Sequence, residues 1–165
     1  MISLVDWKHL PKTPSDEITG EEIKSGKLME YVDDLVQMAV ASRLKCASLP
    51  QAGIAKQLIV LQHDQWIVIA NPKPLSVDTE QLLLKEVHPN FAGIGELPIA
   101  RPSAVRMRCT DITGMKYTQT FSGIDARLLL MQMDYLGGAS PLARLSDLKR
   151  NMVETKLHKM ERRLK

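Results

Sequence analysis

Cysteine is scarce in this chain, which has only Cys46 and Cys109. Two isolated cysteines exclude a disulfide framework and a zinc site built from cysteine pairs. No apolar run is long enough to cross a membrane, and the first residues, MISLVDWKHLPKTP, contain no signal-peptide core. We therefore expect a protein of a reducing, cytoplasmic setting that has no membrane partner.

Several common catalytic motifs are also absent. The chain has no G-x-S-x-G turn, no P-loop and no dinucleotide fingerprint. The glycine turn GIGELP, residues 93–98, is not followed by a helical pattern, so we do not expect it to bind phosphate. Serine, histidine and aspartate all occur, but their spacing does not indicate a catalytic triad.

The composition is that of one folded domain. Of the 165 residues, 44% are hydrophobic and 25% are charged, which is ordinary for a globular protein with a proper core. We predict a single domain over residues 1–165, with an extended, proline-punctuated arm at 1–19 and a basic helix at 142–165. From Lys149 onward the chain has seven Lys or Arg residues and only two Glu residues, whereas the whole chain carries a net charge of +3.

Hydrophobic periodicity predicts a mixed α+β order of elements. Helical spacing of apolar residues indicates a helix over 26–43 and another over 125–138, and short β-branched runs indicate strands. The strands are predicted at 57–61, 66–70, 81–87, 103–111 and 115–121. The first two form a hairpin, and NPKPL ends the second. Ser122 and Asp125 are typical of a capping box at the start of the second helix, and Gly137-Gly138 is typical of its end.

The last helix is predicted to divide into two parts. Its first apolar residues follow a short connection, so we expect Leu145, Leu148 and Met152 to pack on the domain. The later ones, Leu157, Met160 and Leu164, are expected to run past the body. Cations edge that later part: Lys156, Lys159, Arg162 and Arg163. An apolar surface edged by cations suits an acidic, partly apolar protein partner.

The segment DARLLLMQMDYLGG, residues 125–138, has the spacing of a metal-binding helix without its ligands. In H-E-x-x-H, two histidines one turn apart bind a metal and the glutamate moves protons. Here Met131, Gln132 and Tyr135 occupy those three positions. They supply a thioether, a neutral amide and a phenol.

The chain resembles the peptide deformylases, metallo-hydrolases that remove the formyl group from new bacterial and organellar proteins. That family carries G-φ-G-φ-A-A-x-Q, E-G-C-φ-S and Q-H-E-φ-D-H, where φ is apolar. LKCASLPQ (44–51) corresponds to the first motif and LMQMDYLGG (130–138) to the third. IANPKPL and ARPSAVRMRCTDITG resemble the segments between them. The resemblance covers nearly the whole chain from Glu22. It implies antiparallel and mixed sheets around a central helix, with N- and C-terminal helices.

The departures from the family pattern lie where the chemistry would be. The resemblance implies that the motif cysteine and both motif histidines hold the metal. The cysteine position falls near Pro89, and the histidine positions fall on Met131 and Tyr135. Proline offers no ligand atom, and a thioether and a neutral phenol are poor ligands for zinc or ferrous iron. Gln132, at the glutamate position, has no usable proton affinity. We therefore expect no metal and no other cofactor.

Other residues are candidates for a rebuilt site. His88 adjoins the lost cysteine, and with Glu96 it would give at most two ligands. Asp134 matches an aspartate of the family motif that serves as a structural partner of the helix. Cys109 is expected in the core. Gln51 keeps the family glutamine that helps hold the developing oxyanion, but an amide tying its loop to neighbours is favoured.

The sequence therefore predicts a non-catalytic deformylase-like protein that acts as a protein-binding, structural or assembly subunit. The contact would be the basic last helix, or the cleft between SLPQAG, HPNFAG and the helix at 125–138. Two alternatives stay open. One is an active metal-dependent hydrolase with rebuilt ligands. The other is a ribosome- or RNA-associated module that uses the basic last helix and weakens steeply with salt.

Overall fold

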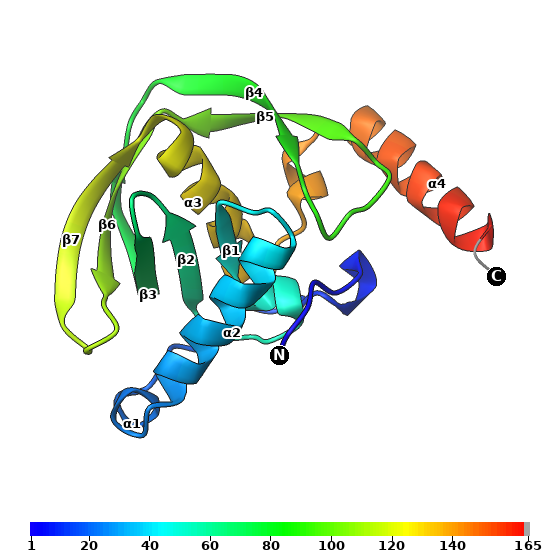
Figure 1. Ribbon diagram of the computed structural model, residues 1–165. Helices are drawn as coiled ribbons and strands as arrows, with labels where there is room; N and C mark the ends of the chain where they lie inside the picture. Colours follow the sequence, from blue (N-terminus) through cyan, green and yellow to red (C-terminus); the bar gives the residue numbers. More distant parts are fainter. Residues whose placement is uncertain (164–165) are drawn as a thin grey trace.

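Figure 1 shows the protein as a computed structural model that describes residues 1–163. Seven strands and four α-helices make up its frame, together with three short 3-10 helices. In chain order the elements are η1 (Trp7–His9), α1 (Gly20–Lys24), α2 (Lys27–Ala41), β1 (Cys46–Ser48), η2 (Leu49–Ala52), β2 (Leu58–Gln62), β3 (Trp66–Val77), β4 (Gln81–Val87), β5 (Glu96–Pro102), β6 (Ala104–Thr110), β7 (Lys116–Ser122), α3 (Gly123–Leu136), η3 (Pro141–Arg144) and α4 (Asp147–Arg163).

An antiparallel sheet of five strands forms the main layer, in the order β1-β2-β3-β6-β7. Buried and exposed residues alternate along β6 from Val105 to Cys109, where Val105, Met107 and Cys109 are buried. Their side chains form one core cluster with Ala126 and Leu129 of α3. Because the inner face of β6 is apolar, α3 packs against the inner side of the curved sheet (Figure 1).

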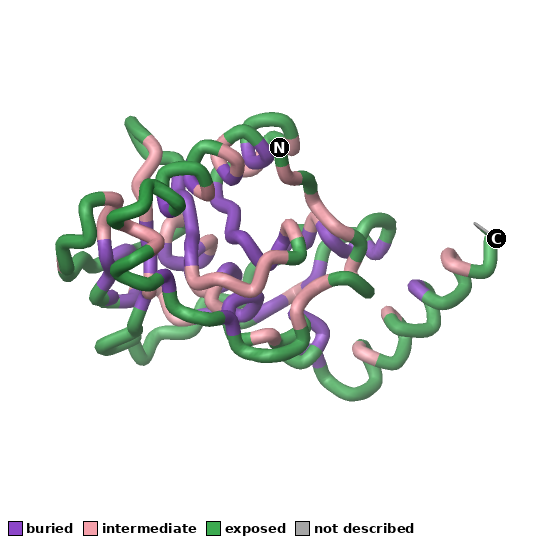
Figure 2. The backbone as a smooth tube through the Cα atoms, turned by 90° about the horizontal axis from the view of Figure 1, so that it is seen from below, coloured by how far each residue is buried: buried purple, intermediate pink, exposed green. Residues whose placement is uncertain are grey.

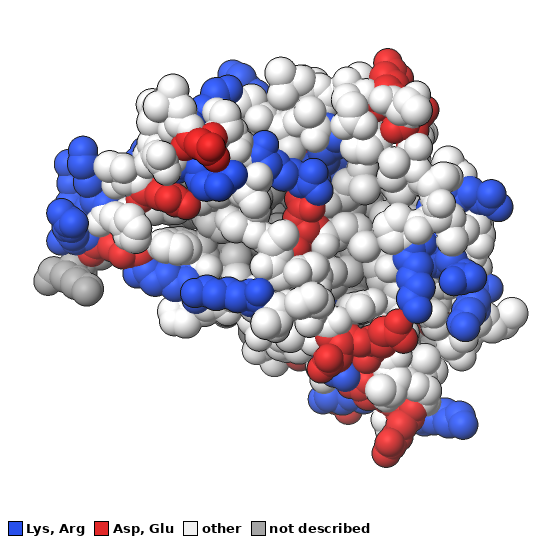
Figure 3. Space-filling view, turned by 180° about the vertical axis from the view of Figure 1, so that it is seen from behind, with Lys and Arg blue, Asp and Glu red and all other residues white. Residues whose placement is uncertain are grey.

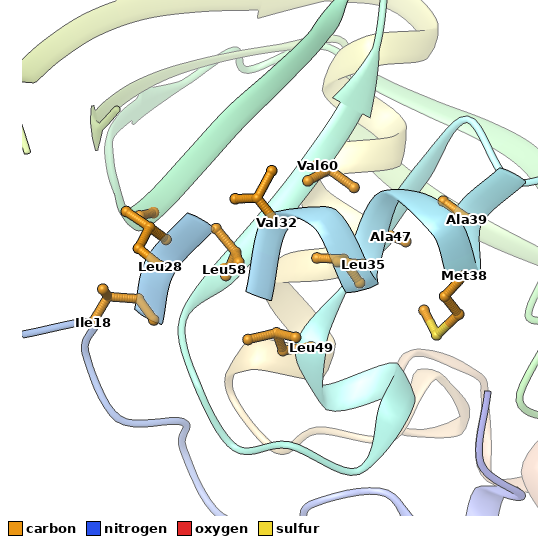
Figure 4. Packing of buried hydrophobic residues seen from close by; sticks show 11 residues of the cluster. Ile18, Leu28, Val32, Leu35, Met38, Ala39, Ala47, Leu49, Leu58 and Val60 are labelled. Atoms are coloured by element: carbon orange, nitrogen blue, oxygen red, sulfur yellow. The ribbon is translucent and has the colours of Figure 1, made fainter. Parts of the chain in front are cut away.

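A second cluster fixes α2 against the short strands β1 and β2. Leu28, Val32 and Leu35 lie on one face of α2, as the helical spacing predicts. They pack on buried residues such as Leu58 and Val60 (Figure 4). The third cluster lies at the other end of α3, where β5, the loop after β4, η3 and α4 meet. α3 therefore contacts both β-sheets and positions the residues of its C-terminal half between them.

The predicted hairpin over residues 57–70 is confirmed as β2 and β3, and the α+β class is confirmed. Two details of the strand prediction are wrong. The segment NPKPL does not end the second strand, because β3 continues to Val77 by pairing with β6 across two irregularities. The segment after Gly95, read only as a turn, is β5, which pairs with β4 over its full length.

The predicted ends of α3 hold only in part. Ser122 is the N-cap residue, but its side chain makes no capping hydrogen bond, so the capping box is wrong. At the other end Gly138 has φ +70°, the left-handed conformation that favours glycine. A Cβ there would lie 2.6 Å from backbone atoms of Thr13. Gly138 is thus required both for the end of α3 and for the close approach of the N-terminal arm.

The C-terminal helix differs most from its prediction. It begins at Asp147 rather than at residue 142, because Pro141–Arg144 forms a 3-10 turn first. Leu148 and Met152, expected to pack, are 73% and 65% exposed, whereas Leu157, expected to project, is 3% exposed. Val153 and Leu157 lie on the same helix face and join the third cluster. Figure 2 shows the mostly exposed course of α4. Leu164 lies outside the described residues. Among residues 1–163 no helix is long and apolar enough to cross a membrane.

The packing of α4 makes a prediction about stability. Leu157→Ala should lower the free energy of unfolding by about 2–5 kcal/mol, because it removes a buried side chain from the third cluster. Leu148→Ala, on the exposed face of the same helix, should change it by less than about 0.5 kcal/mol. Urea denaturation of the two variants measures the difference. Equal effects would contradict the orientation of α4.

Candidate functional site

The C-terminal half of α3 turns Met131, Gln132 and Tyr135 into the interior. Their exposed fractions are 7%, 0% and 3%. Met131 and Tyr135 are one turn apart on the helix and both join the third core cluster, which includes Phe91 and Leu142. The position of a metal-binding helix is therefore filled by packed side chains.

Gln132 is hydrogen-bonded to the loop that resembles the glycine-rich motif. The Ser48 hydroxyl donates to Gln132 Oε1 over 2.7 Å, and both side chains are fully buried. The Gln132 amide nitrogen lies 3.5 Å from the Cys46 carbonyl oxygen, a long contact. Ser48 stands at an alanine position of the family motif. The neutral amide on α3 thus has a hydroxyl partner that the family pattern does not provide.

Gln51 belongs to a second set of amide hydrogen bonds. Its Oε1 accepts from the Ser48 N–H over 3.1 Å, and its Nε2 donates to Asn90 Oδ1 over 3.2 Å. Asn90 in turn donates from Nδ2 to the carbonyl oxygens of Val5 and Gln51, each over 2.8 Å. These bonds join η2, the loop after β4 and the N-terminal arm. The Gln51 amide is thereby committed to holding three segments together.

His88 bridges a carboxylate and a phenol. Its Nε2 lies 3.1 Å from Glu86 Oε2, and its Nδ1 lies 3.1 Å from the Tyr135 hydroxyl. A carboxylate only accepts, so the partners assign a ring proton to Nε2, and in that tautomer Nδ1 accepts from the phenol. Burial, and next the charge of Asp134, raises the pKa of Tyr135, so this hydroxyl keeps its proton. Both ring nitrogens of His88 are already occupied.

A buried ionic network lies beside this histidine. Glu86 pairs with Arg101, whose Nε is 2.5 Å from Glu86 Oε1, and also with Arg127. Asp134 pairs with Arg101 over 3.0 Å and with Arg144 over 2.6 Å. Arg127 also donates to backbone carbonyl oxygens of β4 and β5. Asp134 therefore joins α3 to Arg101 of β5 and Arg144 of η3, the structural role that the family motif implies.

Glu86 is held in its charged form. Burial alone would raise the pKa of this carboxyl, but the hydrogen bonds with His88 and Arg101 and the charge of Arg101 outweigh it. The pKa falls from its ordinary 4.5 to about 2. Two of the groups that hold it, Arg101 and Arg127, were not singled out by the sequence analysis. Their signal is an arginine inside an otherwise apolar strand or helix face.

The other candidate ligands do not gather at this point. Cys46 and Cys109 are buried and free, and burial raises the pKa of the Cys46 thiol and raises that of Cys109 to about 11. Glu96 is exposed and pairs with Lys85 across the β4–β5 sheet. Within the described residues 1–163, no group of three or more His, Cys, Asp or Glu side chains could hold a metal ion.

The side chains at the metal-ligand positions of the family motif, Met131 and Tyr135, do not fit a catalytic metal together with the nearby His88. Such a site needs three good protein ligands and an open position for water. Here His88 is the single strong donor, and its neighbours on α3 are a thioether and a phenol. A buried thioether and a protonated phenol suit neither zinc nor ferrous iron.

An apolar pocket of about 450 Å³ lies on the side of Tyr135 that faces the arm and α4. Trp7 and Phe91 stack there with ring centroids 6.2 Å apart. Pro50, Phe91 and Tyr135 line it, one from each of the three segments predicted to form a cleft. The N-terminal arm and α4 complete the walls, which the sequence did not predict.

Comparison with known proteins places the chain in a family. Residues 7–151 match the polypeptide deformylase family, so the chain belongs to it. The chain is 28% identical over 143 residues to a peptide deformylase of Synechococcus sp., covering 80% of this chain and 70% of that protein. It is 29% identical over 134 residues to a peptide deformylase-like protein of Agrobacterium fabrum, covering 80% and 81%. A crystal structure of Plasmodium falciparum peptide deformylase has a TM-score of 0.84 and 25% identity, covering 96% and 95%.

The contacts of β4 suggest a more exact register for one family position. The sequence places the motif cysteine near Pro89, and the side chain that reaches Tyr135 from the end of β4 is that of the neighbouring His88. Matching the buried Glu86 to the motif glutamate gives E-V-H-P-N over residues 86–90. The cysteine position is then His88 and the motif serine is Asn90. The glutamate, two residues earlier, was the sequence signal for this register.

The lowered pKa of Glu86 predicts how the stability of the fold depends on pH. A carboxyl with a depressed pKa stabilises the fold fully above its ordinary value of 4.5, and that contribution is lost as the pH falls toward about 2. Glu86→Gln should lower stability by about 3–5 kcal/mol at pH 7, because Arg127 loses its counter-charge and Arg101 keeps only that of Asp134. It should also flatten the loss of stability between pH 4.5 and 2. Denaturation at several pH values tests both, with the exposed Glu80→Gln as the matched control.

The corrected register makes a second prediction. Met131→His, Gln132→Glu and Tyr135→His together would place two imidazoles beside His88. Without metal the triple variant should be less stable than the parent, because buried polar groups lose their partners. Zinc should raise the melting temperature of the triple variant but not of the parent. If His88 is also replaced by Pro, zinc should have no effect. A triple variant indifferent to zinc would contradict the placement of His88.

Proposed function

We propose that this chain is a non-catalytic member of the deformylase family that serves as a protein-binding subunit. The observation that carries the proposal is the closed set of contacts at the old metal position. His88 is bonded on both ring nitrogens, Gln132 is bonded to Ser48, and Met131 is packed among apolar side chains. A metal or an attacking water would need atoms that are already engaged.

Loss of the base supports the same conclusion. Metal-assisted deformylation needs a nucleophilic water and a group that accepts its proton. The Gln132 amide cannot take up a proton near neutral pH, and the phenol of Tyr135 has a raised pKa and a histidine acceptor. The Gln51 amide, which would steady a developing oxyanion, is bonded to Ser48 and Asn90. Each chemical role of the family lacks a free group to perform it.

The partner-binding surface in this proposal is the outer face of α4. Leu148 and Met152, one turn apart, are exposed there. The same helix carries exposed cations: Lys156, Lys159, Arg162 and Arg163. This replaces the apolar residues of the sequence-based hypothesis, since Leu157 faces inward, and keeps its cations. An exposed apolar pair edged by positive charge is complementary to an acidic, partly apolar protein surface.

The pocket beside Tyr135 adds a second element to the proposed contact. Its aromatic walls, Trp7 and Phe91, and its side wall of α4, Leu157, are continuous with the helix that carries the outer face. A cavity of this size accepts one or two apolar side chains of a partner segment. In this proposal the partner contacts the cationic outer face of α4 and the apolar pocket on the other side of that helix.

The prediction for activity is that the purified protein does not deformylate a formyl-methionyl peptide, with or without added zinc or ferrous iron. Release of formate is the measurement. An active deformylase run in the same buffer is the positive control. Formate release that survives repurification and is abolished by chelation would overturn the proposal.

A second experiment tests partner binding with substitutions of exposed residues on α4, which should leave the fold intact. Leu148→Ser with Met152→Ser should leave the melting temperature unchanged and abolish co-purification of the native partner. A matched double substitution on another surface, Val40→Ser with Met29→Ser on α2, should leave co-purification intact. Equal recovery of the partner by all three proteins would exclude the outer face of α4 as the contact.

A further inference from the structure

A group of cations lies on the outer face of the main sheet, far from the basic helix. Strand register places Lys73 of β3 opposite Arg108 of β6, and Arg108 opposite Thr118 of β7. Residues directly opposite one another in antiparallel strands project to the same side, so the three side chains form a row. The inner side of β6, by contrast, is wholly apolar.

Two neighbouring rows continue this face. Ser76, Arg106 and Thr120 form the row about 7 Å along the strands in one direction, since alternate residues are that far apart. Thr110 and Lys116 form the row in the other direction. We call the four cations Lys73, Arg106, Arg108 and Lys116 the sheet cations. Hydroxyl side chains occupy most of the remaining positions of the three rows.

Most of the sheet cations have no acidic partner. Within residues 1–163, Lys73 pairs with Glu17 over 2.9 Å, and the other three make no ion pair. The hydrogen bond and charge of Lys73, and also the charge of Lys116, lower the pKa of Glu17, so this carboxylate stays charged and offsets one cation. The face therefore keeps a local excess of positive charge, although the chain before Lys149 has more acids than bases.

A small polar hollow lies within this face. Its volume is about 80 Å³, and it is lined by Glu17, Asn71, Lys73, Arg108, Cys109, Thr110 and Lys116. The Asn71 side chain is already bonded to the backbone of Ile18, which fixes one wall. Three cations and a threonine around a hollow of this size suit a tetrahedral oxyanion such as a phosphate group.

We infer that the outer face of strands β3, β6 and β7 binds the phosphate backbone of a nucleic acid. The three rows hold cations and hydroxyls, the side chains that contact phosphate oxygens, and no aromatic side chain on which a base could stack. A protein partner would require a more apolar centre. Binding should therefore follow charge rather than base sequence.

The position of the face separates this inference from the proposed role of α4. Figure 1 places β6 and β7 at one end of the molecule and α4 at the other. Figure 3 shows Lys and Arg side chains gathered at the right of the view, over the end of the molecule where these strands lie, and others at the far left. A nucleic acid on the sheet face would leave the outer face of α4 free for its protein partner.

The test compares two double variants that remove equal charge from exposed positions. Arg106→Gln with Arg108→Gln alters the sheet face, and Lys156→Gln with Lys159→Gln alters α4. Fluorescence anisotropy measures binding of a 20-nucleotide single-stranded RNA from low to moderate salt. The sheet variant should bind about 10- to 30-fold more weakly at 0.1 M salt and lower the salt slope by about 1.4, at about 0.7 per lost phosphate contact. The α4 variant should bind as the parent does.

Each other outcome overturns the inference. Loss of binding in the α4 variant alone assigns the nucleic-acid contact to the helix. No binding by the parent, or equal weakening by both variants, removes the sheet face as a specific surface. Binding of poly-glutamate as tight as that of RNA, with the same loss in the sheet variant, assigns the face to an acidic protein. Melting curves of both variants confirm that the fold is retained.

Discussion

The buried carboxylate of Glu86 is the interaction on which the rest of the site depends. It lies between Arg101 of β5 and Arg127 of α3, and it also orients His88. Two strands and the central helix thus meet on one negative charge that water does not reach. Because an unpaired buried charge costs far more than a missing apolar contact, the three segments are fixed relative to one another. His88 then places Tyr135, and with it the wall of the apolar pocket.

The fold accommodates Met131, Gln132 and Tyr135 at the motif positions of α3. Two of them keep a polar atom where a neighbour needs one, since Gln132 accepts from Ser48 and Tyr135 donates to His88. Met131 instead packs among apolar side chains. A buried polar group that keeps its hydrogen bond does not destabilise the protein, whereas an unpartnered one would. The fold therefore accommodates an amide and a phenol on α3, while the buried charges of Glu86 and Arg101 stay paired beside them.

Local patterns predicted most of the fold, because they depend on neighbours in sequence. The helix face of Leu28, Val32 and Leu35 and the hairpin at 57–70 followed from periodicity alone. What failed depends on tertiary contacts. β5 forms because β4 offers an edge, and α4 turns Leu157 inward because the third cluster lies there. The register of the second motif could not be fixed from the sequence to better than one residue. The contact between His88 and Tyr135 is what favours His88 over Pro89 at the cysteine position.

The most direct test of the closed site is the state of the His88 ring. Nitrogen-resolved NMR distinguishes the two ring nitrogens of each of the four histidines, and His88→Gln assigns the signals. We predict a proton on Nε2, a slowly exchanging Nε2–H, and no change as zinc is added to excess. A zinc-dependent shift of the Nδ1 signal of His88, at stoichiometric metal, would contradict the account, because it would show a ligand free to bind.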